Sequence, residues 1–530
     1  MKVQLLFNIL ILISFFSFSQ NATFQEKIIT PGPELSSAFG LSVDIQGDLL
    51  VGGDTIDPNG AVPGTGAAFI YRKNDNGDFI FEQKLKAPFL DANNSSDSYG
   101  IDVDIYGDFI AVSAFRYRFA DTSNGFPTVN KAGAVFLYKY DSSTSQWDLV
   151  NQIFAPTRLL NHEFGWRIIL TDTQLFVSEW FYRNTTVNAS RTGKIHIYDY
   201  DSNGNVTYNQ GIDNPEPNSD DFFGSEIALS GNTIAIGTNG EEFDPNANNQ
   251  LNNAGAVYVF EKDASGLFNF QQKVVPNTRA AFANFGDGLD LNDDTMVIGA
   301  VNETRLQPNT TNTLSCGIAY VFKFNGTTWS QTALIEPPTV EDNADFGSSI
   351  NLDGNTALVS YEGGRVPYNG STRSSGLVEQ ITLDNSGQVS NRFTIAPPFP
   401  DSTSEFGFIS SWDGNQLAIG AYTDRGDING NSLNESPGAV YVYNLDTNLS
   451  TDTFSSSALK ISNPVKDNLS IFNLVENVDY NIYDIHGKLV QVGKITKTNS
   501  TLDTSWMAQG VYILKISNAN RLQNFKIIKH

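Results

Sequence analysis

Two loops in the sequence space oxygen-bearing side chains in the way that a calcium site requires. The clearer loop carries them at its first, third, fifth and ninth positions, which are Asp427, Asn429, Asn431 and Glu435. Alternate residues of a tight loop point toward one centre, and Ca²⁺ takes six to eight oxygen ligands. A second loop repeats the spacing with one carboxylate, at Asp244, Asn246, Asn248 and Asn252. Because Asn, Asp and Gly are also ordinary turn residues, a plain turn remains the alternative for both loops.

Aromatic and arginine side chains crowd three other loops of the same part of the chain. Flat rings beside hydrogen-bond donors suit sugar rings or peptide segments, so these loops predict a ligand-binding surface. Packing between loops is the alternative for any single side chain. The candidate ligand-binding residues are Phe115, Arg116, Tyr117, Trp180, Tyr182, Arg183, Arg365 and Tyr368.

Residues suited to catalysis are scarce by comparison. The histidines of this region are His162 and His196, and no HExxH, G-x-S-x-G or clustered His/Cys spacing accompanies them. His162 and Glu163 could form an acid–base pair, although a hydrogen-bonded loop histidine is the commoner case. Paired carboxylates for glycoside cleavage stay open as an alternative, because acidic residues are abundant throughout the sequence.

A repeated Phe-Gly pair, once Tyr-Gly, identifies the elements that must hold these loops. Its spacings are 60, 65, 59, 62, 61 and 60 residues, and such regularity predicts a repeat architecture. The seven copies are Phe39-Gly40, Tyr99-Gly100, Phe164-Gly165, Phe223-Gly224, Phe285-Gly286, Phe346-Gly347 and Phe406-Gly407.

Each repeat predicts four antiparallel strands. A short alternating strand follows the Phe-Gly pair, a glycine followed by Asp or Asn makes a tight hairpin turn, and a second strand runs back. A third strand begins with glycine and is apolar on both faces, as in 255–260, and a more polar fourth strand follows, as in 268–275. Since one four-stranded sheet cannot bury both faces by itself, seven of them predict an all-β, seven-bladed β-propeller.

The two ends of the repeat region predict how the ring closes. The seventh repeat supplies three strands before Asn444, whereas Ala22–Ile29, ahead of the first Phe-Gly pair, reads as an unpaired fourth strand. We therefore expect this N-terminal strand to complete the last blade. A linear solenoid or a string of small sandwiches is the alternative, and an open stack of that kind needs no such closure.

The repeats resemble the FG-GAP repeats of the integrin α-subunit propeller and its bacterial relatives, through the Phe-Gly pairs and segments such as 297–300 and 418–421. The resemblance covers roughly 22 to 446 and implies the propeller fold, whereas propellers host many unrelated functions. It also implies that the carbonyl of Leu433 completes a calcium shell. Asn429 and Asn431 stand where the family prefers Asp, which lowers the charge of that shell.

The C-terminal region reads as a separate small domain. Residues 447–458 form a Ser/Thr-rich linker, and 459–530 alternate as the strands of a small β-sandwich. The order of its segments, down to Phe525–His530, resembles the type A C-terminal sorting domain of the type IX secretion system. The resemblance implies contact with that secretion machinery, export across an outer membrane, and release or attachment at the cell surface.

The N-terminus and the charge balance agree with an extracellular destination. Residues 1–19 combine one lysine, an apolar run and a small-x-small end, which predicts a signal peptide. No later apolar run is long enough to span a bilayer, so we expect no transmembrane segment in the mature chain. The formal charge of −25, from 58 acidic and 33 basic residues, repels phosphate backbones and argues against nucleic acid as a partner.

Together these features predict a signal peptide in 1–19, a propeller in 20–446, a linker in 447–458 and a sorting domain in 459–530. We expect a secreted or cell-surface protein that binds or adheres to a glycan or a protein, with Ca²⁺ as the one cofactor the sequence indicates. A secreted hydrolase or lyase acting on polysaccharide, and a structural surface component, are the alternatives.

Overall fold

The computed structural model describes residues 22–32, 37–57, 64–88, 97–118, 128–306, 313–368, 370–401, 403–431, 433, 436–445, 460–461, 465–472, 478–484, 488–496, 501–517 and 522–529. The chain divides into two compact units, Met1–Thr447 and Asn448–His530, and each is treated by itself below. All regular structure in these ranges is β-strand, with no helix.

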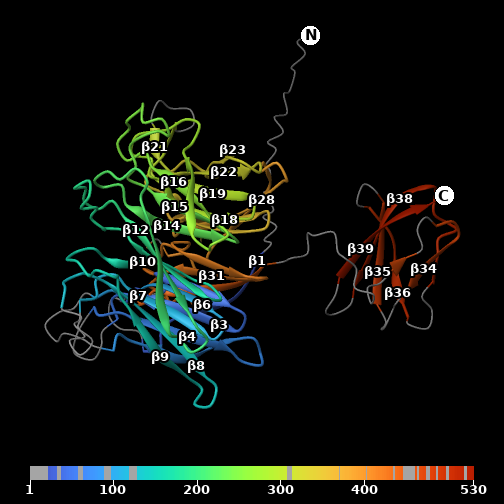
Figure 1. The fold of residues 1–530 in the computed structure, drawn as a ribbon. Coiled ribbons are helices and arrows are strands. Elements are labelled where there is room, and N and C mark those ends of the chain that lie inside the picture. Colours follow the sequence, from blue (N-terminus) through green and yellow to red (C-terminus); the bar gives the residue numbers. More distant parts are fainter. Residues whose placement is uncertain are drawn as a thin grey trace, which may run out of the picture. The chain divides into compact units, whose positions relative to one another are not determined.

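Four-stranded antiparallel sheets recur along the described part of the first unit (Figure 1). We number them by the order of their Phe-Gly pairs. Sheets 1 to 4 consist of β2 (Ser42–Gln46), β3 (Leu49–Asp54), β4 (Ala67–Lys73) and β5 (Phe79–Leu85); β6 (Tyr99–Tyr106), β7 (Phe109–Ala114), β8 (Ala134–Asp141) and β9 (Gln146–Ile153); β10 (Phe164–Leu170), β11 (Gln174–Glu179), β12 (Lys194–Tyr200) and β13 (Val206–Asp213); and β14 (Phe223–Ser230), β15 (Thr233–Thr238), β16 (Ala256–Lys262) and β17 (Phe268–Val274).

Sheets 5 to 7 continue the same plan, with two short hairpins added in the loops of sheets 5 and 6. They consist of β18 (Phe285–Asn292), β19 (Thr295–Ala300), β22 (Ile318–Phe324) and β23 (Trp329–Ile335); β24 (Phe346–Asp353), β25 (Thr356–Tyr361), β28 (Leu377–Leu383) and β29 (Val389–Ile395); and β30 (Ser410–Asp413), β31 (Gln416–Ala421), β32 (Ala439–Leu445) and β1 (Ala22–Ile28). The added hairpins are β20 (Thr304–Leu306) with β21 (Thr313–Ser315), and β26 (Arg365–Tyr368) with β27 (Ser371–Ser374).

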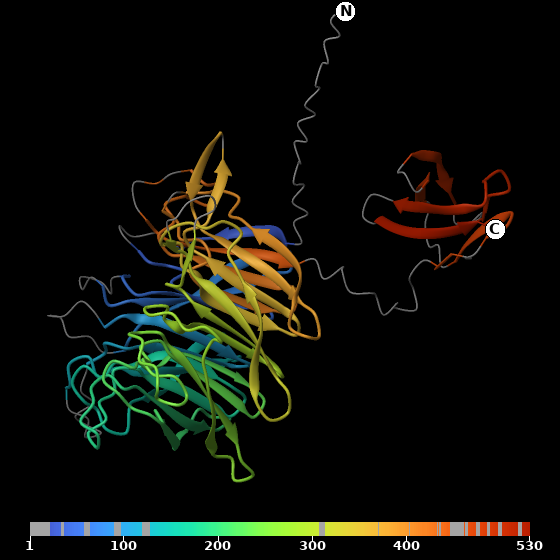
Figure 2. The ribbon, with the colours of Figure 1, turned by 90° about the horizontal axis from the view of Figure 1, so that it is seen from above.

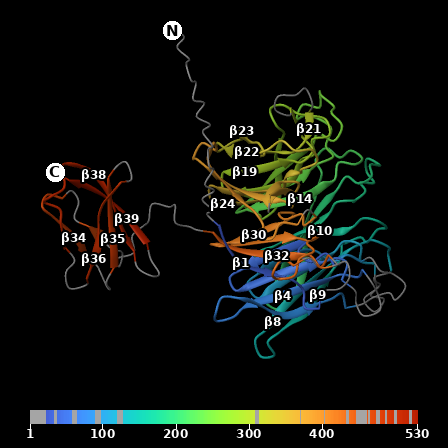
Figure 3. The same ribbon diagram turned by 180° about the vertical axis from the view of Figure 1, so that it is seen from behind.

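The N-terminal strand lies in the sheet that contains the last repeat. β1 pairs antiparallel with β32, from Ala22 opposite Leu445 to Ile28 opposite Val440, and Figure 3 shows the two strands side by side. The Lys27 ammonium lies 2.6 Å from the Asp424 carboxylate, with 1% of either side chain exposed. The two ends of the repeat region are therefore joined by backbone pairing and by a buried ion pair.

The Phe-Gly pair of each repeat packs against the glycine that precedes the third strand of the sheet before it. The N–H of Phe285, for example, donates to the carbonyl of Ala254 at 3.1 Å. A Cβ atom on Gly255 would lie 2.1 Å from the carbonyl oxygen of Phe285, and Gly255 has a φ of +81°. Glycine is required at this joint, because any side chain would force the two sheets apart.

The innermost strands contact one another in a closed order: β2, β6, β10, β14, β18, β24, β30 and back to β2. Side chains on these strands accept backbone N–H groups of the next strand, as Asp44 does from Ile105 at 2.7 Å and Asp290 does from Leu352 at 2.6 Å. Between the last and first sheets, Ser411 accepts the N–H of Ile45 at 3.2 Å. The first unit is therefore all-β and propeller-like, with sheets packed side by side (Figure 2).

The hydrophobic core lies between neighbouring sheets. One cluster joins Val51 and Ile70 of sheet 1 to Tyr99 and Val112 of sheet 2, and each of these four residues is fully buried. The third strands are buried on both faces over most of their length, whereas the middle of each fourth strand is exposed or half-buried, as in β16 and β17. The sequence predicted the apolar third strand and the more polar fourth strand.

The second unit contains two sheets that share one hydrophobic cluster, including Leu469, Ile482 and Leu514. The first sheet consists of β33 (Lys460–Ile461), β34 (Asn468–Phe472) and β37 (Thr501–Asp503). The second consists of β36 (Leu489–Ile495), β35 (Val478–Asp484), β38 (Gly510–Ser517) and β39 (Leu522–Lys529).

Candidate ligand-binding site

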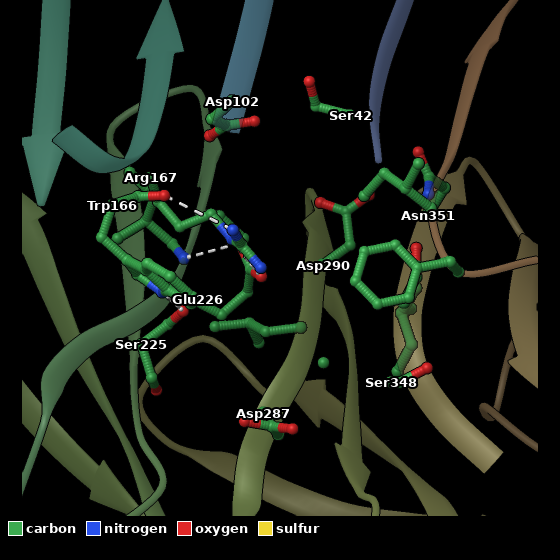
Figure 4. Close-up of a pocket in the computed structure, with 18 of the residues that line it drawn as sticks. Ser42, Asp102, Trp166, Arg167, Ser225, Glu226, Asp287, Asp290, Ser348 and Asn351 are labelled. Atoms are coloured by element: carbon green, nitrogen blue, oxygen red, sulfur yellow. Dashed lines mark hydrogen bonds and ion pairs between the residues drawn. The ribbon is translucent and has the colours of Figure 1, made fainter. Parts of the chain in front are cut away.

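A cavity of about 760 Å³ lies where the innermost strands meet, and all seven of these strands contribute to its lining. Figure 4 shows Arg167 and Glu226 next to each other on one side, with Asp290 and Asn351 on the opposite side. The Arg167 Nε–H donates to Glu226 at 2.8 Å, which links β10 to β14. The cavity is thus built by the inner positions of the repeat, which follow each Phe-Gly pair.

The described lining of the cavity is strongly acidic. It contains six carboxylates, Asp102, Glu226, Asp287, Asp290, Asp345 and Glu362, against the single arginine Arg167. Burial raises the pKa of Asp102 to about 7, although Arg167 and the N–H of Ile168 lower it in part. Burial likewise raises the pKa of Glu362 to about 8, with a lowering contribution from the Ser348 hydroxyl. Asp102 and Glu362 therefore hold their protons to a higher pH than exposed carboxyl groups do.

A glutamine at position 362 is expected to stabilise the protein at pH 8 and to have little effect at pH 5. Between about pH 4.5 and pH 8 the native state keeps a proton on Glu362 that the unfolded state has lost. The free energy of unfolding therefore falls as the pH rises through this range. Glu362→Gln removes that loss, keeps an acceptor for Ser348, and should raise Tm at pH 8 by about 2–4 °C. The control is Glu336→Gln, since the Glu336 side chain is 63% exposed. Equal shifts in both variants, or no pH dependence, would contradict the argument.

Part of the predicted ligand surface forms an aromatic column at one edge of this cavity. Phe115 packs edge-on against Trp166 at 5.3 Å, and Trp166 stacks on Trp180 at 4.0 Å with an interplanar angle of 10°. Trp180 stacks in turn on Phe181 at 4.5 Å, and Arg116 lies over the Phe115 ring at 4.7 Å. Trp166 and Trp180 both line the cavity. The two indoles therefore stack face to face, with Phe115 and Phe181 packed on either side of them, and both indoles border the cavity.

The other predicted ligand residues have different surroundings. Tyr117 is completely buried, so it packs inside the fold. The Tyr182 ring packs edge-on against His162, and Arg183 donates to Asn188 at 2.7 Å. Two further residues belong to the β26–β27 hairpin of sheet 6: Arg365 forms an ion pair with Glu341, and Tyr368 lies under the Arg373 guanidinium. Phe115, Arg116 and Trp180 thus gather around Trp166, and Trp180 lines the cavity. Arg365 and Tyr368 belong to sheet 6 and make other contacts.

The proposed calcium loop adopts a compact turn around Asp427. Its carboxylate accepts the N–H groups of Asn429 and Asn431 at 2.8 Å each, and the Asn431 amide donates to it at 2.9 Å. The N–H of Leu433 donates to the carbonyl of Arg425, and Glu435 lies outside the described residues.

The second predicted calcium loop and a plain hairpin turn share this geometry. Asp244 accepts the N–H groups of Asn246 and Asn248, and Asn252 belongs to the same loop. The hairpin turn between β12 and β13 has Asp201 bonded to Asn203 and Asn205 in the same way. Within the described ranges, no group of three or more His, Cys, Asp or Glu side chains is arranged to hold a metal ion. Calcium therefore stays a prediction that rests on the sequence spacing.

The suggested His162–Glu163 acid–base pair does not form a direct contact. His162 Nδ1 lies 2.8 Å from Glu179, whereas Glu163 accepts the indole N–H of Trp180 at 3.2 Å. Sequence reasoning did not single out Trp166 or Glu179. Trp166 directly follows the third Phe-Gly pair, so an alignment of the seven repeats would have placed it at the cavity.

Comparison with protein-family models finds the FG-GAP repeat at residues 214–260, a stretch that holds the fourth Phe-Gly pair together with β14, β15 and most of β16. This segment is an FG-GAP repeat. The described strands of the other six sheets follow the same plan around their own Phe-Gly or Tyr-Gly pairs, as the sequence predicted.

The model of the secretion system C-terminal sorting domain matches residues 462–530, which is nearly all of the second unit. A domain of this kind marks proteins exported by type IX secretion to the extracellular space or the cell surface, so the predicted destination is confirmed. The described residues contain no helix that is long and apolar enough to cross a membrane.

The remaining comparisons add little. Curated protein sequences give no match. Among solved structures, the crystal structure of Saccharomyces cerevisiae Sqt1 is similar at a TM-score of 0.43 and 11% identity, over 85% of this chain and 95% of that chain. A similarity at this level carries no argument about function.

Proposed function

We propose that this protein is a seven-bladed β-propeller, closed by its N-terminal strand and followed by a small β-sandwich, that binds an extracellular ligand in its central cavity. The observation that carries the proposal is the cavity of about 760 Å³ lined by every innermost strand. Cavities of this size with a few convergent polar groups are the usual binding sites of rigid scaffolds. Export by type IX secretion supplies the extracellular setting.

The charge of the cavity narrows the class of ligand. One arginine stands against six carboxylates in the described lining, and the whole chain carries −25. The described lining thus offers a polyanion only one cationic partner, and the net charge of the chain repels it, so the ligand is a neutral glycan or a protein segment with cationic groups. Carboxylates accept hydrogen bonds from sugar hydroxyls as well as from lysine or arginine, and the edges of Trp166 and Trp180 offer adjacent apolar contact.

Binding is tested with the full chain on arrays of neutral glycans and of basic and acidic peptides. Asp287→Asn, which changes a cavity carboxylate, is expected to weaken binding at least tenfold. Asp148→Asn is the matched control, because Asp148 is exposed on the outer strand β9, and it should bind like the wild type. Equal binding by both variants would show that the ligand does not enter the cavity.

Polysaccharide cleavage is the second candidate function, and one observation favours it. Asp102 and Asp290 both have pKa values of about 7 in the cavity, which suits a general acid that must hold its proton at neutral pH. An increase of reducing ends when the protein is incubated with neutral polysaccharides, lost in Asp102→Asn or Asp290→Asn, would support it. If the polysaccharide binds but is not cleaved, cleavage is excluded and the binding function is kept.

Calcium is proposed as a stabiliser of the loop at Asp427. Millimolar Ca²⁺ should then raise Tm by about 2–4 °C, since extracellular calcium modules bind with dissociation constants near 0.1–1 mM. Asp427→Ala is expected to abolish that gain. Asp201→Ala is the matched control, because Asp201 makes the same turn hydrogen bonds in a plain hairpin. A Tm indifferent to both Ca²⁺ and EDTA would remove calcium from the proposal.

A further inference from the structure

A buried carboxylate joins two histidines in sheet 3. The Glu179 carboxylate, at the end of β11, lies 2.8 Å from His162 Nδ1 and 2.7 Å from His196 Nε2. His162 belongs to the loop before β10, and His196 lies in β12. Between 2% and 7% of each of these side chains is exposed. One carboxylate therefore ties the loop to two strands of the sheet.

The other sheets place different residues at this position. His196 is the third residue after Gly193, and the residues that follow the equivalent glycines of the other sheets are Phe69, Phe136, Tyr258, Tyr320, Glu379 and Tyr441. Where tyrosine is present, its hydroxyl donates to a buried carboxylate, as Tyr258 does to Glu241 at 2.7 Å. Burial raises the pKa of Tyr258 further above the neutral range. Imidazole, in contrast, is the side chain that changes charge between pH 5 and 8.

The loop that carries His162 also holds the aromatic column. The next residue, Glu163, accepts the indole N–H of Trp180 at 3.2 Å, and Trp180 stacks on Trp166 at the cavity. The Tyr182 ring packs against His162 at 5.6 Å. Movement of His162 away from Glu179 would therefore displace the support of Trp180.

We propose that the His162–Glu179–His196 cluster is a pH-sensitive clamp that holds the Trp166–Trp180 pair at the cavity mouth and releases it in mild acid. The clamp acts whether the ligand is a glycan, a peptide or absent, so it stands independently of the proposed function. Its readout is the position of the two indole rings.

The proton count explains why acid opens the clamp. With Glu179 ionised, each neutral imidazole donates one N–H to it. A first imidazolium forms an ion pair with Glu179, but a second leaves a buried charge with no counter-ion. Among the described residues, Nδ1 of His196 has no hydrogen-bond partner, so its protonation would also create a buried donor without an acceptor.

The other charged groups around the clamp are paired with one another, so the charge of the clamp itself decides the direction. On β12, Lys194 adds positive charge, although Asp213 at the end of β13 binds it at 2.8 Å. Tyr198 on β12 and Tyr208 on β13 are uncharged at this pH, since burial raises the pKa of each. At the loop itself, Arg116 and Lys131 face Glu163 and offset its charge.

The pKa of Glu179 sets the lower limit of the transition. Burial alone would raise this pKa, but the hydrogen bonds and charges of His162 and His196 lower it below the ordinary 4.5. The stability that the ionised Glu179 carboxylate gives to the folded state is therefore present above pH 4.5 and is lost as the pH falls below that value. We expect the clamp to open in mild acid, because a second imidazolium beside Glu179 would be a buried charge without a counter-ion.

The experiment follows the near-ultraviolet circular dichroism of the stacked indoles in the full chain from pH 8 to pH 4. Far-ultraviolet dichroism is recorded at each pH so that release is separated from unfolding. The wild type should lose the indole couplet within this pH range while its sheet signal is unchanged. Trp180→Phe should lack the couplet at every pH, which assigns the signal among the six tryptophans of the chain.

Two variants and one control test the clamp. His196→Tyr introduces the side chain that three other sheets carry at this position. It should lower the midpoint of the indole transition by at least one pH unit, or abolish the transition. His162→Gln provides the same test if His196→Tyr does not fold, as judged by its sheet signal at pH 7.5. His486→Gln, in the sorting domain, should titrate like the wild type. A wild type without a transition, or a transition that survives unchanged in the folded clamp variants, would overturn the proposal.

Discussion

Deleting residues 22–29 is expected to lower the stability of the first unit by more than about 5 kcal/mol. The deletion removes β1, which pairs with β32 along its whole length, and it exposes the edge of the last sheet. It also leaves Asp424 buried without Lys27, and breaking a buried ion pair from one side costs about 3–5 kcal/mol by itself. The measurement is guanidinium unfolding of the full chain and of the deletion variant, followed by tryptophan fluorescence.

A point substitution separates the ion pair from the strand. Lys27→Met keeps the apolar stem of the side chain and should lose about 3 kcal/mol, whereas Lys27→Met combined with Asp424→Asn should recover part of that loss. Lys84→Met is the matched control, because Lys84 pairs with Asp57 at the corresponding place in sheet 1 but is 28% exposed. An unfolding curve that the deletion does not change would show that the ring does not depend on its N-terminal strand.

The repeat made much of the fold predictable. Seven copies of one pattern amplify a signal that a single copy would hide, so the strand that follows each Phe-Gly pair was expected, and β10, β14 and β18 begin at those pairs. The unpaired strand at the N-terminus was also predicted and pairs with β32. The β20–β21 and β26–β27 hairpins were not predicted. Each of their strands has three or four residues within a long loop, too few to show an alternating pattern.

The candidate site was less predictable, because its contacts join residues of different repeats. Composition selected Tyr117 together with Trp180, yet Tyr117 is buried and Trp180 borders the cavity. Trp166, its stacking partner, comes from the preceding strand and was missed. The cavity carboxylates carry a signal that could have been used: Asp102 and Glu226 both stand three residues after the aromatic residue that opens their repeat. Alternation along an inner strand then points such residues toward neighbouring inner strands.

Replacing Gly255 with alanine is expected to destabilise the first unit by about 3–5 kcal/mol, although the change adds one methyl group. The new Cβ would lie 2.1 Å from the carbonyl oxygen and 2.4 Å from the backbone nitrogen of Phe285, and backbone atoms of a neighbouring sheet cannot rotate away. The positive φ of +81° adds about 1–2 kcal/mol of local strain. Guanidinium unfolding at pH 7 measures the sum.

Gly266→Ala isolates the contact between sheets from the backbone strain. Gly266 has a similar φ of +87°, lies in the turn between β16 and β17 of the same sheet, and has no atom within 4 Å of its ideal Cβ position. It should lose only about 1–2 kcal/mol, the cost of the positive φ. The difference between the two variants then measures how tightly sheet 4 is docked onto sheet 5. Equal losses would mean that the sheets can separate by the width of a methyl group, and that the Phe-Gly joint does not hold neighbouring sheets at a fixed distance.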